Sequence, residues 1–481
     1  MNQLQTLHKD DIIWEKAHIA LEVSMKKKIA LPIIAVLLIA IMFSLCACWQ
    51  LTSVDDSFPF EAAVTRGEEG SRESWLAGLD APASSPLRRA YDEAVADGSF
   101  EGTYFEFLKE LGVESGNDAY VQSALRSVVT IFATFAPPGI LTMTNIVQMG
   151  SGVIYSLDKA RGDALIVTNY HVIYNHESAG HERVAHISDE ITLFLYGGES
   201  TMSAIEATYL GGAMEYDIAV LKVVGSPILR ETATHAVYAE EVVAANSDSV
   251  TVGERVYAIG NPLGDGMSVT EGIVSVEAEY INVYDSAEKE ILMLLEIRTD
   301  AAINEGNSGG GLFNGAGELI GIVNAGSDDE DVEGFGFAIP SNLALSLAQN
   351  IIDTCAATPG SRGAAVANLD ITIEVWDSHA AFDSETGKFY IEEKTVVSEV
   401  SGLARSMGLR EGDTLVSASL RSSRGGTAYT RTVELRRAYM LENLLFEVRR
   451  GDILALTVSR NNSLKTIAIS YSNSSYFTLI R

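Results

Sequence analysis

The stretch "TDAAINEGNSGGGLFN", from Thr299 to Asn314, places a serine inside a cluster of glycines. Ser308 follows Gly306 and Asn307 and is followed directly by three further glycines, 309 to 311. Glycine tolerates backbone angles that are closed to other residues, so such a cluster marks a tight turn or the close approach of another backbone. We therefore expect a turn that displays the hydroxyl group of Ser308.

Two further residues are candidates to make this serine a nucleophile. Catalysis by serine needs a base that takes its proton, a carboxylate that orients this base, and N–H donors for the oxyanion. "VTNYHVI" places His171 at the end of a strand-like run, and "YDIAVLKV" places Asp217 at the start of another. Alone, each residue has an ordinary interpretation, as a structural histidine, a capping aspartate or a serine in a glycine turn. Together they predict a fold that brings distant strand ends to one place.

The sequence from about Val121 consists of short β-rich runs separated by Gly, Asn and Asp. Examples are "SVVTIFATF", "ALIVTNYHVI", "DIAVLKVV" and "RVYAIGNPLG". Many short strands at close spacing favour an all-β barrel or sandwich over an alternating α/β fold. A helix is expected over 341–355, followed by mixed strands and helices over about 360–475. With 481 residues, the chain is too long for a single core and should form two or three domains.

Six blocks of this sequence resemble the HtrA/DegP family of trypsin-like serine proteases. They are "GSGVI" (150–154), "TNYHVI" (168–173), "DIAVLKV" (217–223), "GNPLG" with "SVTEGIVS" (260–264 and 268–275), "TDAAINEGNSGGGL" (299–312) and "GFGFAIPSN" (334–342). The resemblance implies a mainly β fold, with two six-stranded antiparallel β-barrels over 119–357 and the active site in the cleft between them. A smaller PDZ-like α+β domain would follow over 358–481.

The resemblance also assigns roles to the candidate residues. His171 would be the general base and then the general acid, Asp217 its orienting carboxylate, and Ser308 the nucleophile. The backbone N–H groups of Gly306 and Ser308 would form the oxyanion hole. Relatives of the digestive type carry an aspartate before the serine, which pairs with a freed N-terminus. Asn307 is neutral, so this chain cannot form that ion pair.

Three apolar residues are candidates for the S1 pocket: Ala302, Ile303 and Ile322. Ala302 stands six residues before Ser308, where trypsin has its specificity acid. The resemblance therefore implies a preference for a small aliphatic P1 residue.

No metal site or cofactor is expected from the sequence. His176, His181 and His186 follow His171 at equal intervals, but these intervals match the period of neither a helix nor a strand, which favours an exposed loop. The acidic "SDDEDVEG" (327–334) lacks the spacing of a calcium-binding loop and predicts a solvated hairpin tip.

The C-terminal block resembles a PDZ domain chiefly through "VVSEVSGLARSMGLREGDTLVSASL" (396–420) and "RRGDILALTVSR" (449–460). A PDZ domain binds an extended C-terminal peptide by strand addition and holds its carboxylate with backbone N–H groups of a loop. That loop would lie in "SRGAAVANLDITI" (361–373), which lacks the family's Gly-hydrophobic-Gly signature. Whether this domain binds C-terminal peptides stays open.

Residues 1–48 carry a membrane-targeting pattern. A basic cluster at 26–28 precedes an uncharged run from Ile29 to Leu45. Its length lies at the lower limit of about 17–25 residues for a spanning helix and slightly above the roughly 7–15 of a secretory core. "LCAC" (45–48) resembles a bacterial lipobox, in which Cys48 would be lipidated, and an uncleaved signal-anchor is the alternative. Translation begins at Met1 or at Met25.

The rest of the N-terminal region, 49–118, is rich in Ser, Ala, Gly and acidic residues and predicts a flexible tether. It ends in a short helical motif at 90–113. In either interpretation of the anchor, most of the chain lies on the extracytoplasmic face of a bacterial envelope.

The composition argues against a nucleic-acid-binding protein and against a disulfide-stabilised one. The formal net charge is −31, from 34 Lys and Arg against 65 Asp and Glu. Nucleic-acid binding needs clustered positive charge, so a nucleic-acid partner is not expected. Three cysteines, two of them beside the apolar run, provide no disulfide framework.

The sequence and the resemblance together predict an envelope-anchored, ATP-independent serine endopeptidase that cleaves unfolded or misfolded polypeptides. One alternative is a regulatory protease that cleaves a single signalling substrate under control of the PDZ-like domain. The other is a non-catalytic holdase chaperone. A homotrimer is implied by the family likeness alone.

Overall fold

The computed structural model describes residues 117–136, 145–178, 186–198, 203–262, 266–284, 291–326, 335–384, 387–423 and 428–481. The expected membrane anchor, Cys48, the helical motif at 90–113 and nearly all of the tether lie outside these residues, as do His181 and the acidic stretch 327–334. No helix within the described ranges is long and apolar enough to cross a membrane.

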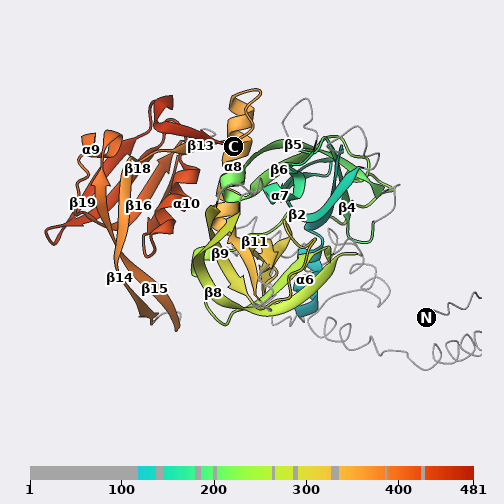
Figure 1. Cartoon of the computed structure of the whole chain (residues 1–481), viewed down its shortest axis with the longest axis horizontal. Coiled ribbons are helices and arrows are strands. Elements are labelled where there is room, and N and C mark those ends of the chain that lie inside the picture. Colours follow the sequence, from blue (N-terminus) through green and yellow to red (C-terminus); the bar gives the residue numbers. More distant parts are fainter. Residues whose placement is uncertain are drawn as a thin grey trace, which may run out of the picture. The chain divides into compact units, whose positions relative to one another are not determined.

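The first barrel is a closed sheet of six antiparallel strands, drawn in cyan and green in Figure 1. Its strands are β1 (Val128–Phe135), β2 (Ile146–Asp158), β3 (Asp163–Thr168), β4 (Glu190–Leu195), β5 (Ile205–Ala213) and β6 (Ile218–Val223). They are hydrogen-bonded in the order β1-β2-β3-β6-β5-β4. Branched apolar side chains such as Ile131, Ile166 and Leu193 alternate into the interior and are buried there, as residues that fit a pleated surface do.

The second barrel is also closed and has six strands. They are β7 (Arg255–Gly260), β8 (Ser268–Tyr284), β9 (Ile291–Thr299), β10 (Gly311–Asn314), β11 (Leu319–Gly326) and β12 (Gly336–Pro340), in the order β10-β11-β12-β9-β8-β7. Val256, Val274 and Ile297 are among the residues of its buried core. Closure leaves neither barrel with an exposed sheet edge.

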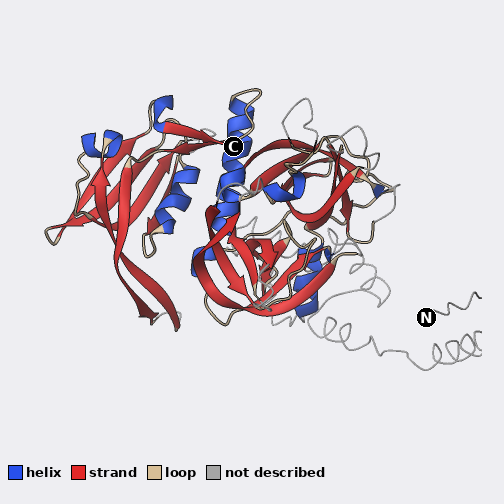
Figure 2. Ribbon diagram, viewed as in Figure 1, coloured by secondary structure: helices blue, strands red, loops and turns tan. Residues whose placement is uncertain are grey.

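Helices are few and mostly short in this part of the chain (Figure 2). They are α6 (Asn117–Leu125), α7 (Tyr170–Ile173) and the 3₁₀ turns η2 (Met214–Tyr216) and η3 (Ser247–Ser249). The prediction of a mainly β, trypsin-like fold is confirmed.

A longer helix, α8 (Ser341–Ala357), follows the second barrel where the sequence predicted one. It contacts β5 and β6 of the first barrel, β11 and β12 of the second, and two elements that come later in the chain, β13 (Ala364–Ala367) and α10 (Tyr439–Glu447). Leu343, Leu347 and Ile351 recur at helical spacing and are buried by these contacts.

The C-terminal part of the chain is a six-stranded sheet with short helices. Its strands are β14 (Ile371–Asp383), β15 (Lys388–Val400), β16 (Thr414–Ser422), β17 (Tyr429–Glu434), β18 (Ile453–Arg460) and β19 (Ser463–Ser470). The order is β14-β15-β16-β18-β19, with β17 paired to β16. The helices of this part are α9 (Gly402–Ser406), α10 and the 3₁₀ turn η6 (Ser474–Tyr476).

The segment 361–373, which the sequence suggested as a peptide-binding loop, is partly a strand. Within it, β13 pairs antiparallel with the last strand, β20 (Phe477–Ile480). The register runs from Ala364 opposite Ile480 to Ala367 opposite Phe477. The chain's own strand therefore occupies the hydrogen-bonding edge of β13 that faces β20.

Candidate active site

The first barrel contributes a histidine and an aspartate that hold each other at two points. His171 lies in α7, directly after β3, and Asp217 lies between η2 and β6. Nδ1 of His171 is 2.7 Å from Oδ2 of Asp217, and the backbone N–H of His171 donates to Oδ1 at 2.9 Å. A carboxylate only accepts hydrogen bonds, so Nδ1 carries the ring proton and Nε2 is left as the basic nitrogen.

The backbone of Asp217 is itself fixed. Its φ of 50° is left-handed, an uncommon conformation for a residue with a side chain. Its main-chain oxygen accepts from the backbone N–H of Tyr170 at 3.1 Å and from Nδ2 of Asn169 at 3.0 Å. These bonds tie the aspartate turn to the histidine helix, so that the two side chains keep their alignment.

The second barrel contributes the glycine turn that displays Ser308. Gly306 and Gly309 have φ values of 95° and 83°, in the region that favours glycine. A Cβ atom at Gly309 would lie 2.1 Å from the main-chain oxygen of Ser151 and 2.2 Å from Oγ1 of Thr168. The glycine cluster therefore serves a tight turn and a close approach of the first barrel, as its sequence predicted.

A buried serine in the "GSGVI" block, Ser151 of β2, holds this turn in place. Its backbone N–H donates to the main-chain oxygen of Ser308 at 2.8 Å, and its Oγ donates to the oxygen of Gly306 at 2.7 Å. The same Oγ accepts from the backbone N–H of Asn261 at 2.9 Å. The sequence showed the block but not this role, which depends on a contact between strands far apart in the chain.

The turn also leaves two hydrogen-bond donors free. Among the described residues, the backbone N–H groups of Gly306 and Ser308 donate to no acceptor. The peptide between Gly306 and Asn307 is fixed at both ends, by Ser151 Oγ on its oxygen and by a 3.0 Å bond from its N–H to the oxygen of Asn304. Unpaired N–H groups on a rigid turn are suited to bind a developing oxyanion.

The Ser308 hydroxyl itself is engaged elsewhere. Its Oγ donates to the main-chain oxygen of Asn324 on β11, at 2.5 Å. A serine hydroxyl has one proton, so this bond and donation to Nε2 of His171 exclude each other. Attack by the serine therefore requires its side chain to turn from Asn324 toward His171.

The three S1 candidates are not all brought to one surface. Ala302 is exposed and Ile303 half-buried, and Ile303 lies against Gly336 of β12. Ile322 is fully buried in the hydrophobic core, out of contact with solvent. In this arrangement Ile322 supports the barrel and presents no surface to a substrate side chain.

The turn before Asp217 contacts the C-terminal part of the chain. Tyr216 donates its hydroxyl to Oε1 of Glu442 on α10 at 2.8 Å, and its ring meets the ring of Phe446 edge-on at a centroid distance of 5.0 Å. Burial, together with Glu442, raises the pKa of Tyr216, so its hydroxyl stays protonated and able to donate. The backbone N–H of Met214 donates to the main-chain oxygen of Arg481 at 3.1 Å.

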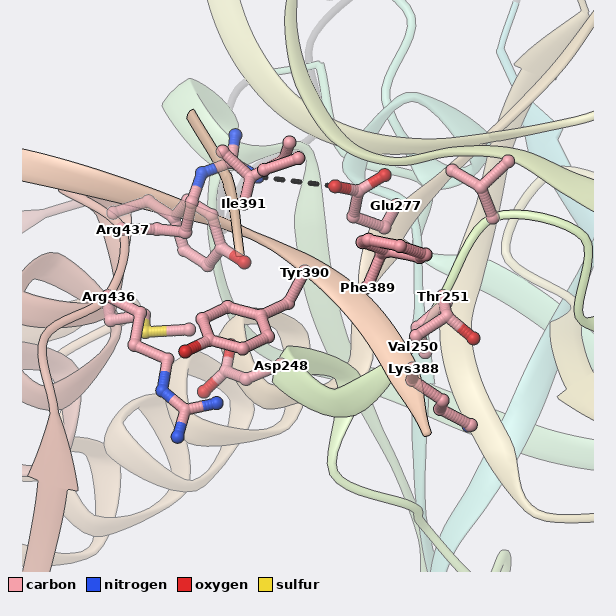
Figure 3. Close-up of a pocket in the computed structure, with 14 residues that line it drawn as sticks. Asp248, Val250, Thr251, Glu277, Lys388, Phe389, Tyr390, Ile391, Arg436 and Arg437 are labelled. Carbon is pink, nitrogen blue, oxygen red and sulfur yellow. Dashed lines mark ion pairs between the residues drawn. The ribbon is translucent and has the colours of Figure 1, made fainter. Parts of the chain in front are cut away.

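A cavity of about 430 Å³ lies elsewhere, between the β14–β15 hairpin and the second barrel (Figure 3). Arg437 lines this cavity and forms ion pairs with two glutamates: its Nε lies 2.8 Å from Oε1 of Glu393, and its Nη1 lies 3.6 Å from Oε1 of Glu277. None of His171, Asp217 and Ser308 lines this cavity, so it is separate from the candidate active site.

Comparison with known proteins identifies the family of this chain. A family model described as a trypsin-like peptidase domain matches residues 150–322. Serine protease Do-like HtrA of Lactococcus lactis subsp. lactis (strain IL1403) is 32% identical over 333 residues, which cover 68% of this chain and 71% of that protein. The chain belongs to the HtrA family of serine proteases. It is therefore a serine endopeptidase.

Further proteins with HtrA names are similar to this chain. Serine protease Do-like HtrA of Bacillus subtilis (strain 168) is 37% identical over 207 residues, covering 42% of this chain and 39% of that protein. Among solved structures, an HtrA-type protease AlgW with a tripeptide is 27% identical, covers 74% of this chain and 96% of its own, and has a TM-score of 0.44.

Proposed function

We infer that this HtrA-family protease is an envelope-anchored, ATP-independent endopeptidase that cleaves unfolded or misfolded polypeptides. His171, Asp217 and Ser308 form its catalytic triad in this proposal. The observation that carries it is the doubly bonded His171–Asp217 pair, placed beside a turn that displays Ser308 and two unpaired N–H groups.

The reaction follows from these positions. Ser308 Oγ attacks the scissile carbonyl carbon while its proton passes to Nε2 of His171, and Asp217 stabilises the resulting imidazolium. The carbonyl oxygen becomes an oxyanion bound by the N–H groups of Gly306 and Ser308, each of which contributes about 2.7–4 kcal/mol to the transition state. His171 then protonates the leaving amine, and water hydrolyses the acyl-enzyme with His171 again as base.

The first step requires the hydroxyl to leave Asn324. A hydrogen bond of this kind contributes about 0.5–1.5 kcal/mol net, so exchanging it for a bond to His171 is a small change in free energy. Substrate binding in the cleft is sufficient to drive such a change.

The C-terminal part, 358–481, is proposed to be a PDZ-like domain that guides substrates. The outer edge of β14 is unpaired among the described strands and offers main-chain groups to an extended peptide. Exposed Val375 and Trp376 on this strand would contact its side chains. The segment 1–48 is proposed to hold the enzyme at the extracytoplasmic face of the envelope, through lipid on Cys48 or through an uncleaved helix, and a homotrimer follows from family likeness.

The regulatory-protease alternative is favoured by one observation. The bond between Tyr216 and Glu442 joins α10 to the turn that carries Asp217. A ligand that moves α10 would therefore act on the catalytic carboxylate through one residue.

Fluorophosphonate labelling of the purified full-length protein tests the catalytic assignment. We expect wild type to be labelled at Ser308 and to cleave unfolded casein. Ser308→Ala should be neither labelled nor active, while melting within a few degrees of wild type, because the hydroxyl is displayed on the turn and supports no core. Residual hydrolysis should not exceed about 10³–10⁴-fold over water, which an ordinary digest does not detect.

The holdase alternative gives a different result. It requires that wild type bind casein without cleaving it and that the Ser308→Ala change alter nothing. Cleavage that persists in Ser308→Ala would contradict the assignment of the nucleophile.

A further inference from the structure

A fully buried acid, Glu296 of β9, is linked to Ser308 through Asn324. Its side chain has no exposed surface, and its Oε1 accepts from Nδ2 of Asn324 at 2.7 Å. Its Oε2 has no hydrogen-bond partner among the described residues. Glutamate is almost never fully buried without a charged partner, so this side chain calls for an explanation.

The bond between these two residues joins β9 to β11 of the second barrel. β9 and β11 are not neighbours, because β12 lies between them in the sheet order. Asn324 is 4% exposed, and its main-chain oxygen is the acceptor of the Ser308 hydroxyl. Glu296 on β9 therefore bonds the side chain of Asn324, and the main-chain oxygen of Asn324 accepts the hydroxyl of Ser308.

The charged group that faces Glu296 is Asp217, from the turn before β6. Burial raises the pKa of Glu296 well above its ordinary range; the bond from Asn324 lowers it, and the negative charge of Asp217 raises it further. Burial and the neighbouring carboxylate therefore both favour the neutral, protonated form of the Glu296 carboxyl group. Its proton lies on Oε2, because Oε1 is the atom that accepts from Asn324.

We propose that Glu296, as a neutral carboxylic acid, is a positioning residue for Ser308: by anchoring Asn324 it fixes the segment of β11 on which the serine turn rests. The residue before Asn324, Val323, exchanges main-chain hydrogen bonds with Gly309 and Gly310 of that turn at 2.8 and 2.9 Å, so release of Asn324 would misalign the turn. This proposal rests on the proposed function, because it assigns Ser308 as the nucleophile. The anchor works only while Glu296 is neutral. Its ionisation would bury a second negative charge beside Asp217, and the group would then draw in water or move toward it, releasing Asn324.

The sign of the pH effect follows from this. As pH rises through the raised pKa of Glu296, the proton on Oε2 is lost and the anchor with it. The reactivity of Ser308 should therefore decline on the alkaline side, and a neutral isostere at position 296 should abolish that decline. A glutamate with a merely structural role would not change the pH profile of the nucleophile.

The experiment compares the rate of fluorophosphonate labelling across pH for full-length wild type, Glu296→Gln and Glu296→Leu. We expect Glu296→Gln to label at nearly the wild-type rate at neutral pH, because its Oε1 still accepts from Asn324, and to lack the alkaline decline. Glu296→Leu leaves the amide of Asn324 unpaired and should label about 10-fold more slowly throughout. Glu318→Gln is a matched control, because Glu318 accepts from Asn314 at 3.0 Å in the turn between β10 and β11. It should leave the profile unchanged.

Two results would overturn the proposal alone: an identical pH profile in wild type and Glu296→Gln, or wild-type labelling in a folded Glu296→Leu. If the leucine variant does not fold, the comparison between wild type and Glu296→Gln still decides. Absence of any labelling in wild type, under conditions that label trypsin, would instead contradict the proposed function, and this inference with it.

Discussion

The two halves of the candidate site differ in how completely they are assembled. In the first barrel, His171 and Asp217 are joined by two hydrogen bonds, and the backbone of each is held by its neighbours. In the second barrel, the turn and its N–H groups are in place, but the Ser308 hydroxyl donates to Asn324. In the proposed mechanism the base is thus already oriented, whereas the serine hydroxyl must first leave Asn324, so we expect regulation of the activity to act on the second barrel.

Replacing Asp217 by Asn alters the hydrogen bond that orients His171 and should have the largest effect on catalysis. An amide group at this position can donate to the histidine, which favours the wrong imidazole tautomer. We expect kcat to fall by about 10⁴-fold with little change in the melting temperature. Steady-state cleavage of a peptide substrate measures this.

Glu215→Gln is the control for that substitution. It removes an exposed carboxylate from the same turn and does not alter the histidine contact. Equal losses in the two variants would mean that charge near the turn matters and that Asp217 has no orienting role.

Replacing Ser151 by Ala tests the other half, because it removes the hydroxyl that fixes the Gly306 oxygen. The oxygen of Gly306 and the N–H of Asn261 would both lose a partner in a buried place. We expect kcat/KM to fall by about 10- to 100-fold, mainly through kcat, because the oxyanion turn loses its alignment.

Ser127→Ala is a matched control for this variant. Ser127 is also buried and donates to a main-chain oxygen, that of Ala124, at 2.7 Å. It should lose similar stability and keep its activity. A loss of activity in proportion to stability in both variants would show that Ser151 has no specific effect on the turn.

Replacing Tyr216 by Phe should have the smallest effect on catalysis. It deletes the bond to Glu442 and keeps the ring against Phe446. A hydrogen bond to a charged group contributes about 1.5–3 kcal/mol, so we expect the free energy of unfolding to fall by about 1.5 kcal/mol. The effect on kcat should stay below about threefold, a barrier change under 1 kcal/mol.

A double-mutant cycle with Glu442→Gln measures the coupling between these two side chains. Additive losses in stability would mean that the pair does not interact in solution. A large loss of kcat in Tyr216→Phe would instead place control of the enzyme in the first barrel, against the comparison above.

Much of this site could be predicted from sequence, because its main residues lie in local patterns. The glycines around Ser308 report a backbone need that any turn of this kind has, and His171 and Asp217 each stand at the end of a strand-like run. The resemblance to the HtrA/DegP family then implied that these three residues share one site. The β fold and the helix after the second barrel could be predicted for the same reason, from the periodicity of apolar residues and the spacing of turn residues.

The contacts that tune the site were not predictable in this way. Ser151 bonds a turn far along the chain, and Glu296 bonds Asn324 on a strand that is not paired with its own. Both contacts depend on strand register and closure, which single-residue patterns do not encode. Ile322 shows the converse, because an apolar residue near the site in sequence proved to face the core.

The hydrogen bonds from Ser151 to the serine turn affect how that turn moves. Ser151 belongs to the first barrel, and it bonds the main chain of both Gly306 and Ser308. Nδ2 of Asn261, after β7, reaches back to Oγ1 of Thr130 on β1 at 2.9 Å. The serine turn is thus hydrogen-bonded to the first barrel, which carries His171, as well as to the second barrel, to which it belongs. If the two barrels moved relative to each other, Ser308 would move together with His171. The distance between these two residues would therefore change little.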